Sequence, residues 1–435
     1  MKPSYIKNAL RKTIVSMSSN IELFVKNPGK DFTRNRKITF RDILVSTISL
    51  ESHSLNHEMR KFFFKQGVNI PSKSALIQQR DKLNDNVFRH LFLEFNGRIP
   101  FKKTFKGYHL LACDGSDLNL PPLKSDNKTR VSSNTKDVYY HQAHLNAIYD
   151  LLEQRYTDIL IQPRAEYNER TAFIDFIRRN QVPGKCIFIA DRGYFSVNVL
   201  AHLLSSGQFF LIRMMEEGHG AAFLKRFKPP KDNEFDIMIS LEATRSNKRL
   251  YTGQPVKYYV IHKNRQFDFI PKEDKTTLYP MTFRAIKLIL PNGNAEYLIT
   301  NLPQETFDIT ALSELYFMRW GIETSFRHLK YNMSLNSFHS IRRDFIEQEI
   351  YAKVILYNFT LLLAQCVIVS QKSRKYHYKV AISDATVTAR YFLIHAIKNQ
   401  EMEILLLKYL TDIRHDRSFP RKVRSKRYIS FNNRD

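Results

Sequence analysis

The chain has 435 residues, and its 68 lysine and arginine residues against 42 aspartate and glutamate residues give a formal net charge of +26. This length favours roughly two to four domains rather than one core. So large a positive charge indicates a polyanionic partner, with nucleic acid as the first candidate and an anionic membrane surface as the second.

The membrane alternative is weak, because the most apolar stretch, residues 350–369, contains Lys353, Asn358 and Gln365, which are costly in lipid. We expect a buried core helix there. No apolar run follows the basic N-terminus, so we expect no signal peptide. The three cysteines favour reduced core thiols of a cytosolic protein, and no Cys/His spacing indicates zinc.

Residues 1–100 are expected to form a helical, basic, DNA-binding region. Thr39 and Asp42 form a capping-box pattern at the start of one helix. Two further helices, at 56–66 and 74–83, flank a glycine-containing turn, and both a helix-turn-helix and an ordinary helical hairpin fit this pattern. The basic residues of this region are Arg34, Arg36, Lys37, Arg41, Lys73, Arg80 and Lys82.

Residues 101–214 change to a pattern of alternating strands and helices. This order predicts a mixed sheet flanked by helices. The expected strands cover residues 108–114, 144–152, 158–162, 186–191 and 208–214, and the expected helices cover 169–179 and 196–204.

Residues 215–303 are predicted to be a β-rich insertion, with strands at 258–261, 282–290 and 297–300 and a turn at Pro291-Asn292-Gly293. Helices are expected to return within 304–370. Residues 371–435 are expected to be a helical, basic C-terminal region and tail. The tail either touches DNA or only aids solubility, and its basic residues are Arg414, Arg417, Arg421, Lys422, Arg424, Lys426 and Arg427.

The helix expected at 310–332 brings charged residues onto one strip. At about 100° per residue, Tyr316, Arg319, Glu323 and Lys330 lie within roughly 60°, and the neighbouring face, with Met318, Ile322 and Phe326, is expected to be buried. A carboxylate beside two cations can bind a metal ion and the phosphates on which the metal acts. The alternative is a solvated face with an Arg–Glu pair four residues apart.

Two aspartates end apolar strands and are followed closely by glycine, in Asp114-Gly115-Ser116 and Asp191-Arg192-Gly193. A carboxylate at the end of a buried strand is costly unless it is hydrogen-bonded or metal-bound. Each aspartate alone could instead be a turn residue or a helix N-cap. Asp117 competes with Asp114, which has the advantage of lying directly at the strand end.

Three carboxylates suit two Mg²⁺ ions, which prefer oxygen ligands and can stabilise both the attacking and the leaving oxygen in phosphodiester transfer. In a chain this basic, such a triad indicates cutting or joining of nucleic acid.

The sequence resembles the IS4-type transposases of bacterial insertion sequences, members of the wider DDE transposase group. The signature Tyr-x₂-Arg-x₃-Glu-x₆-Lys is intact as Tyr316, Arg319, Glu323 and Lys330, and the two Asp motifs precede it in the expected order. The resemblance covers roughly residues 34–335. The four-residue signature is its specific part.

The resemblance implies an α/β, ribonuclease H-like mixed-sheet catalytic core, interrupted by the β-rich insertion, with helical N-terminal and C-terminal regions. It implies that Asp114, Asp191 and Glu323 bind Mg²⁺, for which Mn²⁺ can substitute, and that Tyr316, Arg319 and Lys330 contact DNA phosphates. Trp320 and Arg327 are further candidate DNA contacts. Some relatives hold a flipped base with an insertion-domain aromatic residue, for which Tyr297 is the nearest candidate and a plain strand tyrosine the alternative.

We therefore expect a cytoplasmic, bacterial cut-and-paste transposase that binds double-stranded DNA, both at its inverted repeats and at a target, as a homodimer on paired ends. Two rivals stay open: another ribonuclease H-like nuclease such as a resolvase, and an inactive transposase-derived DNA-binding protein. The three carboxylates should face one open, positively rimmed cleft lined by Arg319 and Lys330, and without metal their repulsion can hold them further apart.

Overall fold

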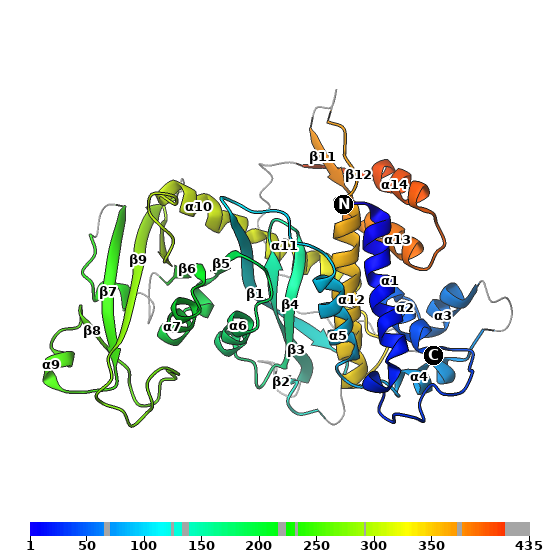
Figure 1. Ribbon diagram of the computed structural model, residues 1–435, viewed down its shortest axis with the longest axis horizontal. Coiled ribbons are helices and arrows are strands. Elements are labelled where there is room, and N and C mark those ends of the chain that lie inside the picture. Colours follow the sequence, from blue (N-terminus) through cyan, green and yellow to red (C-terminus); the bar gives the residue numbers. More distant parts are fainter. Residues whose placement is uncertain are drawn as a thin grey trace.

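The computed structural model describes residues 1–64, 70–122, 126–132, 139–215, 223–230, 234–290, 293–371 and 376–413. The molecule is elongated, with a long sheet at its centre and one end and a helical assembly at the other (Figure 1). The predicted basic tail beyond residue 413 lies outside the described residues, as do residues 67–69 of the turn predicted at 67–72 and residues 291 and 292 of the turn predicted at 291–293.

Five strands form the centre of the sheet in the order β4-β3-β1-β5-β6. The first three pair antiparallel, whereas β1, β5 and β6 run parallel. This mixed α/β arrangement is the fold class expected from the sequence. The bounds are β1 Tyr108–Leu120, β3 Tyr139–Asp150, β4 Arg155–Pro163, β5 Lys185–Ala190 and β6 Phe209–Met214.

The strands of the expected insertion continue this sheet and do not form a separate one. Strand β10 pairs with β6, and the order continues through β9, β7 and β8, so the described residues contain one ten-stranded sheet. The sequence pattern does not predict β7, whose inward and outward residues alternate only irregularly. The bounds are β2 Arg130–Ser132, β7 Phe235–Thr244, β8 Tyr258–Val260, β9 Tyr279–Ile289 and β10 Ala295–Thr300, and a short helix, α9 Arg249–Thr252, precedes β8.

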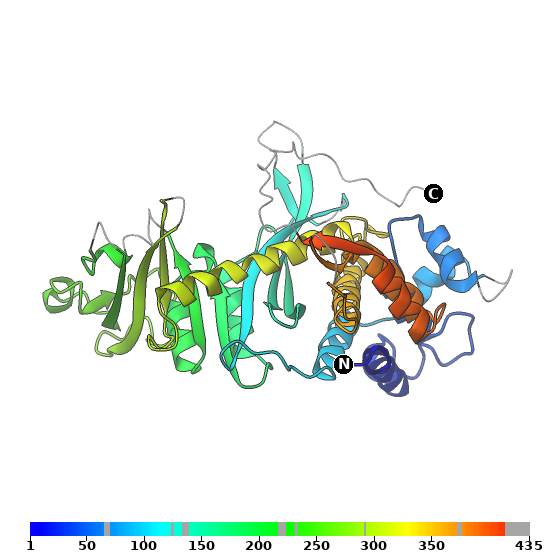
Figure 2. The same ribbon diagram turned by 90° about the horizontal axis from the view of Figure 1, so that it is seen from above.

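Helices cover both faces of the central strands. Helices α6 (Glu169–Arg178) and α7 (Val197–Ser205) pack over alternate residues such as Leu111 and Cys113. On the other face lie α10 (Ile309–Met318) and α11 (Trp320–Tyr331), which cross the sheet as one nearly continuous rod (Figure 2). Because strand side chains alternate, the intervening residue Ala112 faces α11.

The N-terminal region is helical, as expected, and packs against the long helix α12 (Arg343–Ala364). Thr39 and Asp42 form the predicted capping box at the start of α2, each accepting a hydrogen bond from the other residue's backbone. The helices are α1 Pro3–Ser19, α2 Phe40–Ser49, α3 Leu55–Phe63, α4 Lys73–Arg80 and α5 Val87–Gly97, and a single 3₁₀ turn covers Ile21–Phe24.

Helix α12 lies in the predicted core segment and is buried on nearly every side, although it ends at Ala364 rather than near residue 369. Among the described residues, no helix is long and apolar enough to cross a membrane. The C-terminal elements pack beside it, in agreement with a helical C-terminal region. They are β11 His377–Val380, α13 Ile382–Leu393, α14 Asn399–Lys408 and β12 Leu410–Ile413.

Candidate active site

The pairing of β1 with β5 explains why Asp114 and Asp191 meet. The two strands are parallel, and Cys113 pairs with Ala190 in their register. Asp114 and Asp191 are the next residues on adjacent strands, which lie about 4.8 Å apart in sheets. Ala112 and Ile189, two residues earlier, both belong to the core under α11. Alternation therefore directs both aspartates towards α11.

Helix α11 brings Glu323 to the same place. It packs on β1, with Ile322 and Phe326 buried as predicted. Met318, also predicted to be buried, is only half-buried at the end of α10. Gly321 permits the close approach, since a Cβ there would lie 2.9 Å from Leu151 Cδ2.

Arg319 joins two of the three carboxylates. Its Nη2 donates to Glu323 Oε1 at 2.8 Å, and its Nη1 lies 3.6 Å from Asp114 Oδ2. The guanidinium is buried, which by itself would lower the pKa of Arg319, but Tyr316, Glu323 and Asp114 raise it overall. Arg319 is therefore a permanent cation among the three carboxylates.

Tyr316 reaches the third carboxylate. Its hydroxyl donates to Asp191 Oδ1 at 3.3 Å. Asp191 also accepts a hydrogen bond from the backbone N–H of Arg192 at 2.7 Å, at the start of the short 3₁₀ turn Arg192–Tyr194. Asp191 is thus a cap residue, as the alternative interpretation held, and at the same time a member of this cluster.

The register also separates Asp114 from its competitor Asp117. Three residues apart on β1, the two side chains point to opposite faces of the sheet. Asp117 lies 2.8 Å from His144 Nδ1 and 3.7 Å from Arg164, so it belongs to a different set of contacts.

Lys330 lies near the site and is bonded to β1. Its Nζ donates to Ser116 Oγ at 2.7 Å and to Asp117 O at 2.8 Å, which ties α11 to the end of β1. Burial lowers the pKa of Lys330. The other two DNA-contact candidates on this helix are accessible: Trp320 is 49% exposed and Arg327 is exposed.

Tyr297 points away from the carboxylates. It belongs to β10, pairs with Met214 of β6, and packs near Phe235 in the core on the α6 side. Its neighbour Glu296 points to the opposite face and forms an ion pair with Arg213 at 3.1 Å. Burial raises the pKa of Glu296, and Asp191 raises it further, against the opposing effect of Arg213 and Arg319.

The sequence does not predict Glu296 and Arg213 as site residues, yet they form the border of this charged cluster. They stand on β10 and β6, the two strands that pair across the boundary of the expected insertion. No local motif marks them. Only the pairing of strands separated by about 80 residues brings them next to Asp191.

The pKa of the Asp114 carboxyl is shifted upwards. Burial raises its pKa to about 6, and the charges of Glu323 and Asp191 add to the rise, while a hydrogen bond from Gly115 N–H and the charge of Arg319 oppose it. The cation therefore compensates only part of the negative charge.

Replacing Asp114 with asparagine is expected to stabilise the metal-free protein at pH 8. With a folded-state pKa of about 6 against 3.8 ordinarily, ionisation penalises folding fully above pH 6, partly between these values, and not at all below them. About two pKa units correspond to at most about 3 kcal/mol. Thermal unfolding of Asp114→Asn and wild type at pH 8, 6 and 4 checks this, and an equal gain at all three pH values contradicts it.

The donor set fits a hard divalent cation, because all three residues supply carboxylate oxygens. Across the described parts of the chain, however, no three His, Cys, Asp or Glu side chains are gathered closely enough to hold a metal ion. Arg319 lies between two of these carboxylates, with its hydrogen bond to Glu323 and its approach to Asp114.

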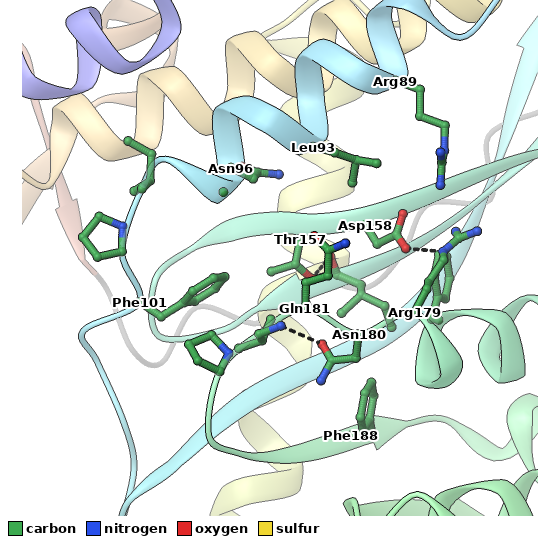
Figure 3. Close-up of a pocket in the computed structure, with 17 residues that line it drawn as sticks. Arg89, Leu93, Asn96, Phe101, Thr157, Asp158, Arg179, Asn180, Gln181 and Phe188 are labelled. Carbon is green, nitrogen blue, oxygen red and sulfur yellow. Dashed lines mark hydrogen bonds and ion pairs between the residues drawn. The ribbon is translucent and has the colours of Figure 1, made fainter. Parts of the chain in front are cut away.

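A cavity of about 560 Å³ opens elsewhere, between α5, β4 and the end of α6 (Figure 3). Arg179 and Asp158 form an ion pair at 2.5 Å on its wall, with Arg89 above them. None of the three carboxylates lines it. Its chemistry is therefore separate from the candidate active site.

The chain is similar to known proteins in two comparisons. A family model described as "Transposase DDE domain" matches residues 106–359. One similar solved structure is the cryo-EM structure of a piggyBac transposase synaptic complex with hairpin DNA, at 11% identity and a TM-score of 0.48, covering 92% of this chain and 82% of that chain. No curated protein matches the chain. The family match spans more than half of the chain, including β1, β5 and α11, and the chain therefore belongs to the DDE transposase domain family.

Proposed function

We propose that this transposase binds the terminal inverted repeats of its own insertion sequence and catalyses cut-and-paste transposition. The observation that carries the proposal is the register of β1 and β5, which sets Asp114 beside Asp191 under the helix that bears Glu323. Water first cuts the DNA at the transposon end. The freed 3′-hydroxyl then attacks target DNA, with no covalent protein–DNA intermediate.

Asp114, Asp191 and Glu323 would hold the divalent metal, Mg²⁺ or Mn²⁺. When bound, the metal supplies Lewis-acid stabilisation of the attacking and leaving oxygens of the phosphodiester. Arg319 then has to give up at least part of its contact with Glu323 and Asp114. Because its guanidinium is already beside both carboxylates, we infer that it turns towards the DNA phosphate that arrives with the metal.

Tyr316 and Lys330 complete the phosphate contacts in this proposal. The Tyr316 hydroxyl, now bonded to Asp191, can donate to a phosphate oxygen on the same side. Lys330 stands at the other end of the strip, at Ser116. Trp320, half exposed and the only tryptophan of the chain, is placed to contact the bound strand, so its fluorescence should change when end DNA binds.

The N-terminal region offers a surface for the rest of the DNA end. An open cavity of about 530 Å³ lies between the end of α1, the following loop and the start of α2, and Arg34, Arg36 and Arg41 line it. All three are exposed. Arg80, the basic residue of α4, does not belong to this surface, because it is buried in an ion pair with Glu349.

Replacing Arg34, Arg36 and Arg41 together with alanine should weaken end binding and flatten its salt dependence. Each phosphate contact contributes about 0.9 to the log–log slope of affinity against salt, so the slope should fall by about 2 to 3. Fluorescence anisotropy at several salt concentrations measures this. A matched triple variant of exposed residues at the far end of the sheet, Lys248, Arg249 and Lys263, should leave the slope closer to that of wild type. If the slope falls equally in both variants, the surface at Arg34, Arg36 and Arg41 is not the site of end binding.

One substrate series separates the proposed function from its rivals. The protein is incubated with Mg²⁺ and linear DNA that carries its terminal repeats, scrambled repeats, or a branched junction. A transposase cuts at the repeat ends and joins them to target DNA as a paired-end homodimer. A resolvase prefers the junction, and an inactive derivative binds the repeats without cutting. The IS4-type affiliation, which rests on Tyr316, Arg319, Glu323 and Lys330, predicts short inverted repeats flanking the coding region.

A further inference from the structure

One side chain outside the proposed triad lies beside the glycines that follow both aspartates. A Cβ built on Gly115 would lie 3.2 Å from Glu169 Oε1, and a Cβ built on Gly193 would lie 3.2 Å from Glu169 Oε2. Gly115 directly follows Asp114, and Gly193 comes two residues after Asp191. The two oxygens of the Glu169 carboxylate therefore lie beside the backbone at both glycines.

Helix α6 holds Glu169 in this position. Glu169 is its first residue, and the side chain of the N-cap Asn168 accepts hydrogen bonds from the N–H groups of Arg170 and Thr171, both at 3.1 Å. Arg170 Nε donates to Gly193 O at 3.2 Å. The start of α6 is thus bonded to the loop after Asp191 by a second contact.

His144 connects Glu169 to β1. The imidazole is buried between two carboxylates, with Nδ1 2.8 Å from Asp117 Oδ1 and Nε2 3.3 Å from Glu169 Oε1. It lies directly over Gly115, where a Cβ would come within 2.2 Å of Nε2. Any side chain larger than glycine at position 115 would displace this imidazole.

We propose that Glu169 is a positioning residue of the active site, which holds β1 at Asp114 and the turn after Asp191 at a fixed spacing by its position against Gly115, Gly193 and His144. The inference rests on the proposed function. Active sites need their groups within about 0.5 Å of the productive geometry, and a misplacement of about 1 Å can cost about 100-fold in rate. The pairing of β1 with β5 ends at Cys113 and Ala190, so a contact just beyond it can fix where Asp114 and Asp191 stand.

The first test compares Glu169→Ala with Glu169→Gln. Alanine removes the Glu169 carboxylate, so single-turnover cleavage of terminal-repeat DNA should fall about 100-fold. The Mn²⁺ concentration for half-maximal metal binding, read by EPR on the protein–DNA complex, should rise about tenfold. Repeat binding should stay within about twofold. Glutamine keeps the shape and a hydrogen-bond acceptor for His144, so it should restore the rate to within about tenfold of wild type.

The second test is a double-mutant cycle with Gly193→Ala. The backbone of Gly193 does not need positive φ, so alanine acts only through its contact with Glu169. Gly193→Ala should slow cleavage when Glu169 is present, because the added Cβ presses on its carboxylate. It should add little in the Glu169→Ala background, where that carboxylate is absent. Glu166→Ala is the control, since Glu166 only pairs with Lys128 at the surface.

The outcomes are distinct. If Glu169→Ala cleaves and binds Mn²⁺ like wild type, or if the Gly193 effect is the same in both backgrounds, the positioning role is wrong. If Glu169→Gln is as inactive as Glu169→Ala, the charge itself acts on the metal and the positioning role is again wrong. If the wild-type protein does not cut repeat DNA, the proposed function itself is wrong. If Asp114→Asn is inactive but Glu169→Ala is active, only the positioning role of Glu169 is wrong.

Discussion

Neutralising any one of the three carboxylates, as Asp114→Asn, Asp191→Asn or Glu323→Gln, is expected to lower strand cleavage by at least about 1,000-fold. Each change removes an anionic oxygen ligand and keeps the shape of the side chain, and a shared metal site tolerates the loss of none of its charged ligands. The expectation follows from the placement of two residues by strand register and of the third by α11. Gel assays of cleaved terminal-repeat DNA in Mg²⁺ measure the effect.

End binding supplies the control for this experiment. The variants should fold and bind terminal-repeat DNA to within a few fold of wild type, because the proposed N-terminal surface at Arg34, Arg36 and Arg41 is unaltered. Glu166→Gln is the matched variant, since Glu166 is exposed and pairs with Lys128 at the surface. Near wild-type cleavage by any one of the triad variants would remove that residue from the site.

Replacing Arg80 with methionine should destabilise the folded protein by about 3 to 5 kcal/mol, the usual cost of leaving one buried charge without its partner. Arg80 of α4 donates to Glu349 of α12 at 2.9 Å and to Gln348 at 2.7 Å, and both charged side chains are buried. Burial tends to raise the pKa of Glu349, but Arg80 and His339 lower it to about 2. Urea unfolding followed by circular dichroism measures the loss.

The sign of the pH dependence follows from Glu349. Its folded pKa lies below its ordinary 4.5, so the pair contributes its full stability above that value and loses it as pH falls towards 2. In Arg80→Met this contribution should be absent at neutral pH. The double variant Arg80→Met with Glu349→Met should recover much of the loss, because no buried charge is left alone. Arg60→Met, at an exposed position on α3, should change stability little. A double variant no more stable than Arg80→Met alone would contradict this account.

Much of the local structure follows from the sequence alone. The helix at Glu169–Arg178 and the core strands lie where the apolar periodicity predicts them, and the capping box at Thr39 forms as expected. Regular elements with a buried face repeat every 2.0 or 3.6 residues, so their type can be read from neighbouring residues. The weakly patterned strand β7 was missed for the same reason, and the insertion strands gave no sign that they continue the central sheet.

The candidate active site also combines features that the local sequence determines with features that only strand pairing determines. Tyr316, Arg319 and Glu323 share one stretch of helix, so their common strip is a local property that the sequence determines. That Asp114 rather than Asp117 faces this strip, and that Tyr297 faces away, depends on which residue of each strand pairs with which neighbour.

Only the tertiary structure decides those pairings, because they join residues tens of positions apart. Strand order, register and helix packing set the side chains around Asp114, including the buried Arg319 bridge and the carboxylate of Glu169 behind Gly115. A shift of one residue in register would exchange the two faces of β1 and move Asp114 to the α6 side. The residue types of the active site can thus be recognised in the sequence, whereas their assembly into one charged cluster depends on the folded sheet.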